Sequence, residues 1–151
     1  MKKLDKRIVY NAFKDKLSEQ LKVLQDKLGA EHQAILDESK SSAGDKYETQ
    51  REMIQSDMNR TMTQIENQKQ NLSKLVFTEN EYITNGSLVQ LKRGDTMFTV
   101  FVGPSIGDIE IEGVLIKSVS PNSPLGNKII NLKVADKLNF NDQTIEIVNC
   151  Y

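Results

Sequence analysis

Apolar residues recur at helical spacing through two long stretches in the first half of the chain. In residues 4–38 they fall on alternating steps of four and three, and Glu31 is the one exception. The seam positions are Leu17, Leu21, Leu24, Leu28 and Ile35. This pattern is typical of a coiled coil, so the stretch predicts a long helix with one apolar stripe.

A second stretch continues the same rhythm after a short break. Its apolar positions are Ile54, Met58, Ile65, Leu72 and Leu75. Thr61 and Gln68 occupy seam positions between them, so this seam is the more polar one. Two arms of about 30 residues joined by a short turn form an antiparallel pair, and each arm would be roughly 45 to 50 Å long. We therefore expect an antiparallel helical hairpin.

The break at residues 39–45 contains residues that favour turns over helix. Ser41, Ser42 and Gly44 lie here, and no proline occurs in either flanking stretch. Residues 31–57 contain seven acids and three bases, whereas residues 1–27 contain eight bases and four acids. The predicted hairpin is therefore acidic at its tip and basic at its base.

The apolar pattern changes from helical to alternating near residue 78, and the rest of the chain predicts strands. Residues 88–92 and 97–102 alternate on either side of a turn, as in a β-hairpin. Residues 109–116 form another extended apolar pattern, and residues 138–148 predict a closing hairpin. The alternating pattern thus predicts a small antiparallel sheet.

One short helix is expected within this half, at residues 124–131. Ser123 can cap the helix, and Pro124 suits its first position. The predicted fold class is α+β: an N-terminal antiparallel coiled-coil hairpin at 1–77, then a small antiparallel β-sheet domain with a short helix at 78–151. A second compact domain is needed because a long hairpin cannot fold back on itself.

The composition argues against several classes of protein. The net charge is −1, which disfavours direct, sequence-specific binding of nucleic acid. No stretch approaches the roughly 18 apolar residues of a membrane span, and no signal-peptide run follows the basic start. We therefore expect a cytoplasmic protein without a membrane partner. Cys150 is the one cysteine and His32 the one histidine, which excludes an internal disulfide and argues against a zinc site.

Three segments of the second half resemble the bacterial transcript cleavage factors of the Gre family. They are Gly86-Ser87-Leu88-Val89, Ser123-Pro124-Leu125-Gly126 and Leu132-Lys133-Val134-Ala135-Asp136. The resemblance covers essentially the whole chain. It implies that the second half is an FKBP-like domain that docks on RNA polymerase, and that the hairpin enters the polymerase secondary channel. It makes Ser123, Pro124, Leu125 and Gly126 candidate polymerase contacts.

The predicted tip resembles the family motif Gly-Asp-x-x-Glu-Asn-x-Glu-Tyr in its first part only. Gly44-Asp45-Lys46-Tyr47-Glu48 matches without a gap, and Thr49 and Arg51 replace the usual Asn and Glu. A second alignment brings Tyr47 onto the family tyrosine. That alignment puts Lys40 and Ala43 at the acid positions and would leave no cleavage chemistry.

In the first alignment, the resemblance implies that Asp45 and Glu48 act in the polymerase active site. They would share a Mg²⁺ ion there, with no cofactor bound to the protein alone, and Tyr47 would contact the polymerase. Mg²⁺ takes few protein carboxylates and keeps several waters, which suits two acids presented from outside. The same Asp-x-x-Glu spacing is also a helix capping box, with Asp45 as N-cap. Both interpretations stay open.

Four hypotheses for function remain. The first is an accessory elongation factor, not itself an enzyme, that stimulates cleavage of backtracked transcripts by RNA polymerase. The second is a secondary-channel inhibitor or regulator without cleavage activity, favoured by the residues that follow Glu48. The third is an FKBP-like prolyl isomerase or chaperone, whose pocket should be lined by aromatic residues. The last is a coiled-coil scaffold that dimerises through its seam.

The seam predicts a monomer, because the antiparallel partner helix in the same chain covers each apolar stripe. Light scattering coupled to a sizing column should therefore give the mass of a single chain over a wide concentration range. A mass of two chains would favour the scaffold hypothesis instead.

Overall fold

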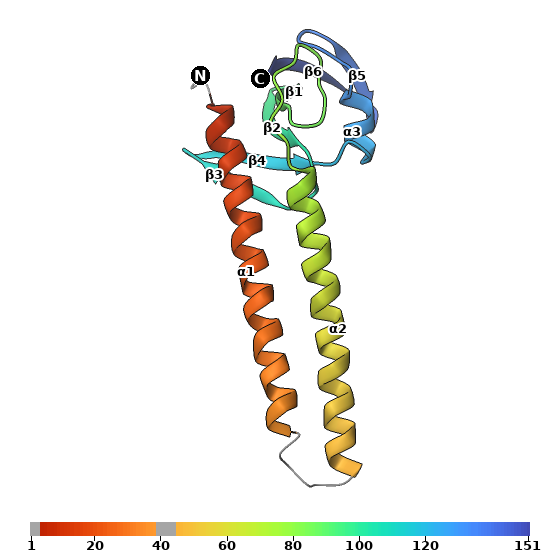
Figure 1. The fold of residues 1–151 in the computed structure, drawn as a ribbon. Helices are drawn as coiled ribbons and strands as arrows, with labels where there is room; N and C mark the ends of the chain where they lie inside the picture. Colours follow the sequence, from red (N-terminus) through yellow and green to blue (C-terminus); the bar gives the residue numbers. More distant parts are fainter. Residues whose placement is uncertain (1–3, 39–44) are drawn as a thin grey trace. The chain divides into compact units, whose positions relative to one another are not determined.

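The computed structural model describes residues 4–38 and 45–151, so residues 39–44 of the expected tip lie outside the described residues. The chain divides into two compact units. One is Lys16–Leu72, and the other joins Met1–Asp15 to Ser73–Tyr151. The first is helical, and the second contains a sheet (Figure 1).

The expected α+β fold class is confirmed. Helices α1 (Lys6–Glu38) and α2 (Asp45–Lys74) come first and are followed by the strands and one short helix. The later elements are β1 (Leu88–Arg93), β2 (Thr96–Val102), β3 (Asp108–Ile111), β4 (Val114–Val119), α3 (Pro124–Ile129), β5 (Lys137–Phe140) and β6 (Gln143–Cys150). None of the helices in the described ranges is long and apolar enough to cross a membrane.

The predicted seam is the buried stripe of the helical unit. In α1, Leu17 is fully buried and the later seam residues through Ile35 are half-buried, while most of their neighbours are exposed. In α2, Thr61 and Ile65 are buried, and Ile54, Met58 and Gln68 are half-buried. Burial therefore follows the four-and-three spacing of the sequence.

Each of the two polar seam positions of α2 bonds to a polar side chain of α1. The Thr61 hydroxyl lies 2.7 Å from the Glu31 Oε1 atom, to which it donates. Farther along, the Gln68 side-chain amide donates to the Gln20 side-chain carbonyl at 2.7 Å. Gln68 lies later in α2 than Thr61, and its partner Gln20 lies earlier in α1 than Glu31. The two helices therefore run antiparallel, as expected. The Glu31 Oε2 atom is buried and has no hydrogen-bond partner among the described residues.

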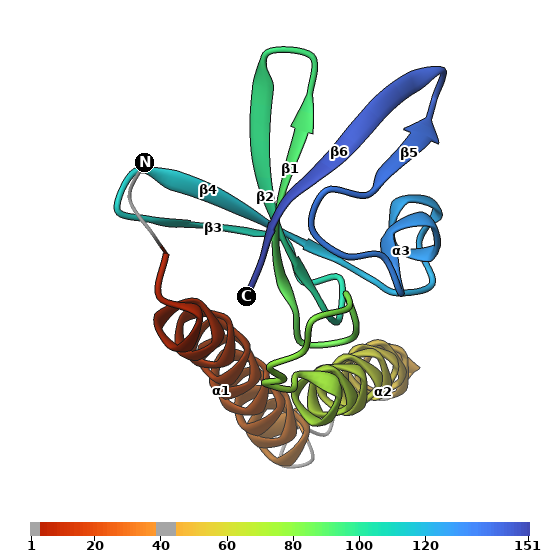
Figure 2. The ribbon, with the colours of Figure 1, turned by 90° about the horizontal axis from the view of Figure 1, so that it is seen from above.

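The six strands form one sheet in the order β3-β4-β2-β1-β6-β5 (Figure 2). The predicted hairpins β1–β2 and β5–β6 are confirmed, and β3 pairs antiparallel with β4. The expectation of a wholly antiparallel sheet is corrected at one place, because β2 and β4 are parallel. After β2 the chain passes Gly103-Pro104 and forms β3 at the edge of the sheet, beyond the place of β4. It then turns back at Glu112-Gly113 and forms β4 between β3 and β2. Strand β4 therefore runs in the direction of β2.

Each face of the sheet has its own apolar cover. One face contributes a core cluster that includes Val89, Val100 and Ile147, and Ile129 of α3 belongs to it. On the other face, the Phe101 ring lies 5.3 Å from the ring of Phe13 in α1, and both side chains are buried. The first turns of α1 thus belong to the compact sheet unit. The boundary expected at residues 77/78 remains a prediction about independent folding.

The Glu31–Thr61 contact predicts a specific mutational pattern. Replacing Thr61 with Val leaves the half-buried Glu31 carboxylate without its donor, which should cost about 1 to 3 kcal/mol of unfolding free energy. The double variant Glu31→Leu/Thr61→Val removes both polar groups and should recover at least the original stability. Urea unfolding followed by helical circular dichroism measures both values.

Thr63→Val is the matched control, because Thr63 is exposed and bonds to the Asn59 carbonyl at 3.1 Å, as Thr61 also bonds to the Asp57 carbonyl at 3.0 Å. Its effect should stay below about 0.5 kcal/mol. Equal losses at Thr61 and Thr63 would show that the cross-helix contact contributes nothing.

Candidate functional site

The Ser-Pro-Leu-Gly segment builds the start of α3 as expected. The Ser123 backbone is extended, and its Oγ accepts the Gly126 N–H at 3.1 Å. The same hydroxyl donates to the Ser120 carbonyl at 2.6 Å, which ties the helix start to the chain that leaves β4. Pro124 occupies the first helical position, where no N–H partner is needed. The helix ends at Ile129, two residues before the expected end.

Gly126 is required by a close backbone approach. It is buried, and a Cβ atom built on it would lie 1.9 Å from the Ser120 carbonyl oxygen. Any side chain here would push α3 away from the residues that follow β4. Ser123 and Gly126 therefore hold the helix in place, whereas their role as polymerase contacts stays a prediction.

An apolar hollow of about 300 Å³ lies beside Leu125, on the face of the sheet that α3 covers. Its lining is Arg93, Thr96, Phe98, Val100, Lys117, Val119, Leu125, Phe140 and Ile145. The strand register explains this grouping, since Arg93 lies opposite Thr96 and Val100 lies beside Lys117 on the same face. Pro124 lines a separate, more polar cleft together with Lys128 and Phe140.

The two tip acids stand at the beginning of α2. Asp45 is the first residue of the helix, and Glu48, one turn later, is exposed. The side chains of Asp45 and Tyr47 lie outside the described residues, so the capping and metal-binding interpretations both remain predictions. Within the described part of the chain, no three His, Cys, Asp or Glu side chains gather to hold a metal ion.

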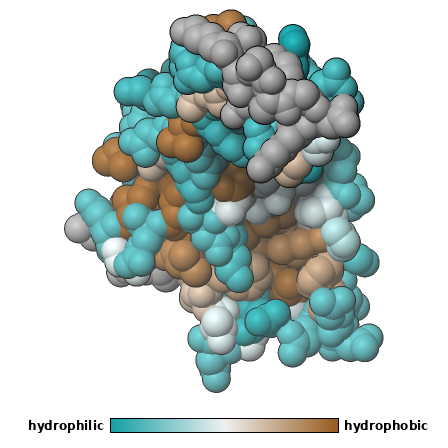
Figure 3. Space-filling view, turned by 90° about the horizontal axis from the view of Figure 1, so that it is seen from below, coloured by the Kyte–Doolittle hydropathy of each residue, from teal (hydrophilic) through white to brown (hydrophobic). Residues whose placement is uncertain are grey.

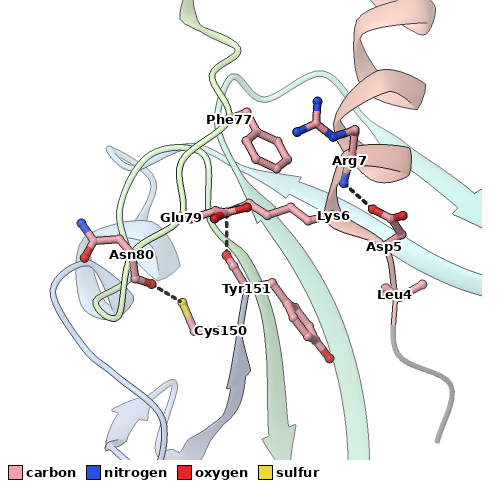
Figure 4. Close-up of a pocket in the computed structure, with 9 residues that line it drawn as sticks. All are labelled: Leu4, Asp5, Lys6, Arg7, Phe77, Glu79, Asn80, Cys150 and Tyr151. Carbon is pink, nitrogen blue, oxygen red and sulfur yellow. Dashed lines mark hydrogen bonds between the residues drawn. The ribbon is translucent and has the colours of Figure 1, made fainter.

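A third cleft, of about 680 Å³ and more polar than the hollow beside Leu125, lies between the start of α1 and the end of β6 (Figure 4). The Lys6 ammonium group donates to the Tyr151 carbonyl at 2.6 Å and lies 5.1 Å from the centre of the Phe77 ring. The Arg7 guanidinium lies at the same distance from that ring. The Cys150 thiol points to the Asn80 carbonyl, 3.8 Å away. The contacts of Lys6 and Arg7 hold the first turn of α1 on the sheet unit.

Burial shifts the pKa of two groups in this cleft. Burial lowers the pKa of the Lys6 ammonium, and the nearby Cys150 and Glu79 partly oppose that change. Burial also raises the pKa of the Cys150 thiol, against weaker lowering by Ser87 and Lys6. Burial thus disfavours the charged form of both groups.

Apart from Leu125, the sequence analysis did not point to the residues around the hollow. Four of them, Arg93, Phe98, Lys117 and Phe140, lie on four different strands, and no local motif links them. The available signal was the alternation in residues 97–102, which puts Phe98 and Val100 on one face. Which strands become neighbours on that face is decided only by the sheet order.

No protein-family model matches the chain, and no curated protein matches it. Among solved structures, the chain is similar to the GreA factor homolog 1 (Gfh1) protein of Thermus thermophilus, with 22% identity and a TM-score of 0.38. That match covers 91% of this chain and 94% of the other. The Thermus aquaticus Gfh1 structure has 22% identity and a TM-score of 0.37, over 91% and 92% of the two chains. A structure of "the transcription factor Gfh1" has 20% identity and a TM-score of 0.39, over 91% and 92%.

The close approach at Gly126 predicts that Gly126→Ala is destabilising, although Ala is usually the better helix former. We expect a loss of about 3 kcal/mol, because a backbone oxygen cannot move aside cheaply. Gly29→Ala is the matched control, since nothing lies within 4 Å of its Cβ position inside α1. That substitution should add up to about 1 kcal/mol. Thermal unfolding compares the two, and stabilisation by both would contradict the predicted clash.

Proposed function

We propose that the protein is an accessory factor of RNA polymerase that inserts its helical hairpin into the secondary channel and stimulates cleavage of backtracked transcripts. It would lend carboxylates to the polymerase and would have no catalytic site of its own. The observation that carries the proposal is an exposed Glu48 one turn after Asp45, at the start of α2, in a sequence segment that resembles the Gre tip motif.

The position of the acids suits this chemistry. Residues three apart on a helix lie on the same side, so Asp45 and Glu48 would face one ion. Carboxylate oxygens are suitable ligands for Mg²⁺, and two of them leave room for waters and a phosphate oxygen. When bound, the ion would polarise the scissile phosphate and help to activate a water. The chain's own contribution is to hold two negative charges at the end of a paired helix.

The sheet unit would supply the docking surface. Leu125 and Pro124, from the Ser-Pro-Leu-Gly segment that resembles the family, line hollows on either side of the α3 start. Ser123 and Gly126 support that surface from behind through the contacts to Ser120. In this proposal the sheet unit binds the polymerase, and the hairpin takes part in the cleavage reaction.

A second candidate is a secondary-channel inhibitor that binds polymerase and does not support cleavage. The specific observation in its favour is the pair Thr49 and Arg51, which stand where the motif has Asn and Glu. The extra positive charge of Arg51 would weaken a cation site nearby. Both candidates share the partner and differ only in the effect on cleavage.

Replacing the tip acids by their amides separates the roles of Asp45 and Glu48. Asp45→Asn and Glu48→Gln keep size and most capping ability but remove the charge that a cation needs. Each should lower the rate of stimulated cleavage in stalled elongation complexes by about two orders of magnitude. Loss of a helix cap alone would cost about 1 kcal/mol of stability and little rate.

Glu52→Gln is the matched control, because Glu52 is exposed one turn farther along α2. It should cleave like the unchanged protein, and polymerase binding should be equal in all three variants. If the unchanged protein binds polymerase and slows elongation without cleavage at any Mg²⁺ concentration, the inhibitor replaces the first candidate. If the amide variants cleave normally, Asp45 and Glu48 are caps.

A further inference from the structure

The helical unit keeps a carboxylate in its seam while it leaves apolar side chains outside. Val23, Met53 and Met62 are exposed on the two helices, and Figure 3 shows apolar residues in brown among teal polar ones on the molecular surface. Glu31 is the reverse case, because it stands at a seam position and its Oε2 atom is buried with no hydrogen-bond partner among the described residues. A leucine here would complete the apolar stripe of α1. Stability alone therefore does not account for Glu31.

The Glu31 carboxylate is matched to a single place on α2. Its Oε1 atom accepts the hydroxyl of Thr61, a fully buried residue, at 2.7 Å. If the two were separated, Thr61 could still donate to the Asp57 carbonyl, 3.0 Å away, so the cost would fall on the carboxylate. The bond between Gln68 and Gln20 lies at an exposed edge, where water can replace either partner. The Glu31–Thr61 contact thus discriminates more strongly between pairings of the two helices.

A slip of the helices by one heptad breaks this contact in either direction. In one direction Glu31 moves against the apolar Ile54. The same slip moves Thr61 against Leu24. In the other direction Glu31 meets Gln68, but Thr61 is carried to the last residue of α1 and Gln68 loses its own partner. Each slip separates the carboxylate from the hydroxyl that donates to it, so the observed register is favoured over both neighbours.

A change of register also moves the turn of the hairpin along the chain. Facing positions rise on one helix as they fall on the other, so a slip of one heptad displaces the turn by about three to four residues. That displacement is roughly one turn of helix. Asp45 and Glu48 occupy the first turn of α2. A slip would draw these two acids into the hairpin turn or leave them one helical turn farther from it.

We infer that Glu31 is a positioning residue for the tip acids: by pairing with Thr61, it restricts the hairpin to one register and keeps Asp45 and Glu48 in the first turn of α2. The inference rests on the proposed function, in which those acids serve the polymerase. A buried polar residue that fixes register while it lowers stability is well attested in coiled coils. Glu31 acts through the pairing of the helices and not on the substrate.

Spin labels on two exposed serines measure the register directly. Ser18→Cys and Ser56→Cys place the labels on either side of the polar pair, roughly 25 to 30 Å apart along the helix axis. Cys150→Ser removes the native thiol from every variant. Pulsed EPR on the labelled full chain, diluted with unlabelled protein, should give one distance. Glu31→Leu/Thr61→Val should add a second distance, shorter by roughly 10 Å along the axis, because the slip that makes both contacts apolar is then open.

The same double variant tests the consequence for the tip. Stimulated cleavage in stalled elongation complexes, at saturating protein, should fall by the fraction of molecules with the shifted distance. The loss is about twofold if the two registers are equally populated. Polymerase binding and the urea midpoint of unfolding should not fall. A merely structural role for Glu31 would leave both the distance and cleavage unchanged in a variant that is at least as stable.

Two control variants separate register from stability. Leu28→Ala shortens a half-buried seam residue and leaves the polar pair intact, so it should lower the urea midpoint and still give one distance. Glu31→Gln keeps an acceptor oxygen for the Thr61 hydroxyl, so it should give one distance and normal cleavage.

The outcomes distinguish this inference from the proposed function. A single, unchanged distance in the double variant overturns the inference and leaves the proposed function standing. A second distance in Leu28→Ala as well would show that any weakened seam slips, which also overturns it, as does undiminished cleavage by a double variant with two distances. If the unchanged protein stimulates no cleavage at any Mg²⁺ concentration, the proposed function fails, and the distances alone decide whether Glu31 sets the register.

Discussion

The helical unit depends on one constraint: a narrow stripe on each long helix must be covered by the other. Two helices bury little apolar surface, so each seam position supplies a large share of the buried area that stabilises them. Glu31 and Thr61 would be costly at such positions if each faced an apolar partner. Their contact at 2.7 Å turns two exceptions into a matched pair that favours one register. Because α2 starts at Asp45, that register also sets where the candidate acids stand relative to the end of α1.

The sheet unit is organised around a different constraint, the close packing of α3 against the residues that leave β4. The Ser123 hydroxyl accepts from Gly126 and contacts Ser120, and Gly126 leaves space for the Ser120 carbonyl. With α3 held in this way, Leu125 forms one wall of the hollow, while the strands supply the floor. A motif that resembles a family signature therefore acts largely through backbone geometry, and only part of it is available to a partner.

The proposed activity requires very little chemistry from the chain itself. Two carboxylates suffice if the polymerase supplies the remaining ligands, the substrate and the exclusion of water. In that proposal, the affinity for the polymerase would come from contacts other than those of the two acids. In the cleft beside Cys150, the Lys6 ammonium group donates to the Tyr151 carbonyl and so holds the start of α1 on the sheet unit.

The sequence by itself determined the local features: two long helices, their seam, the strand hairpins, and the capped start of α3. These follow from spacing, turn residues and capping, which act over a few residues. Only the tertiary structure decided that Glu31 meets Thr61, that β4 runs parallel to β2, and that the first turns of α1 join the sheet unit. It also brought Arg93, Phe98, Lys117 and Phe140 around one hollow. Those outcomes depend on which distant segments become neighbours, and no local pattern contains that information.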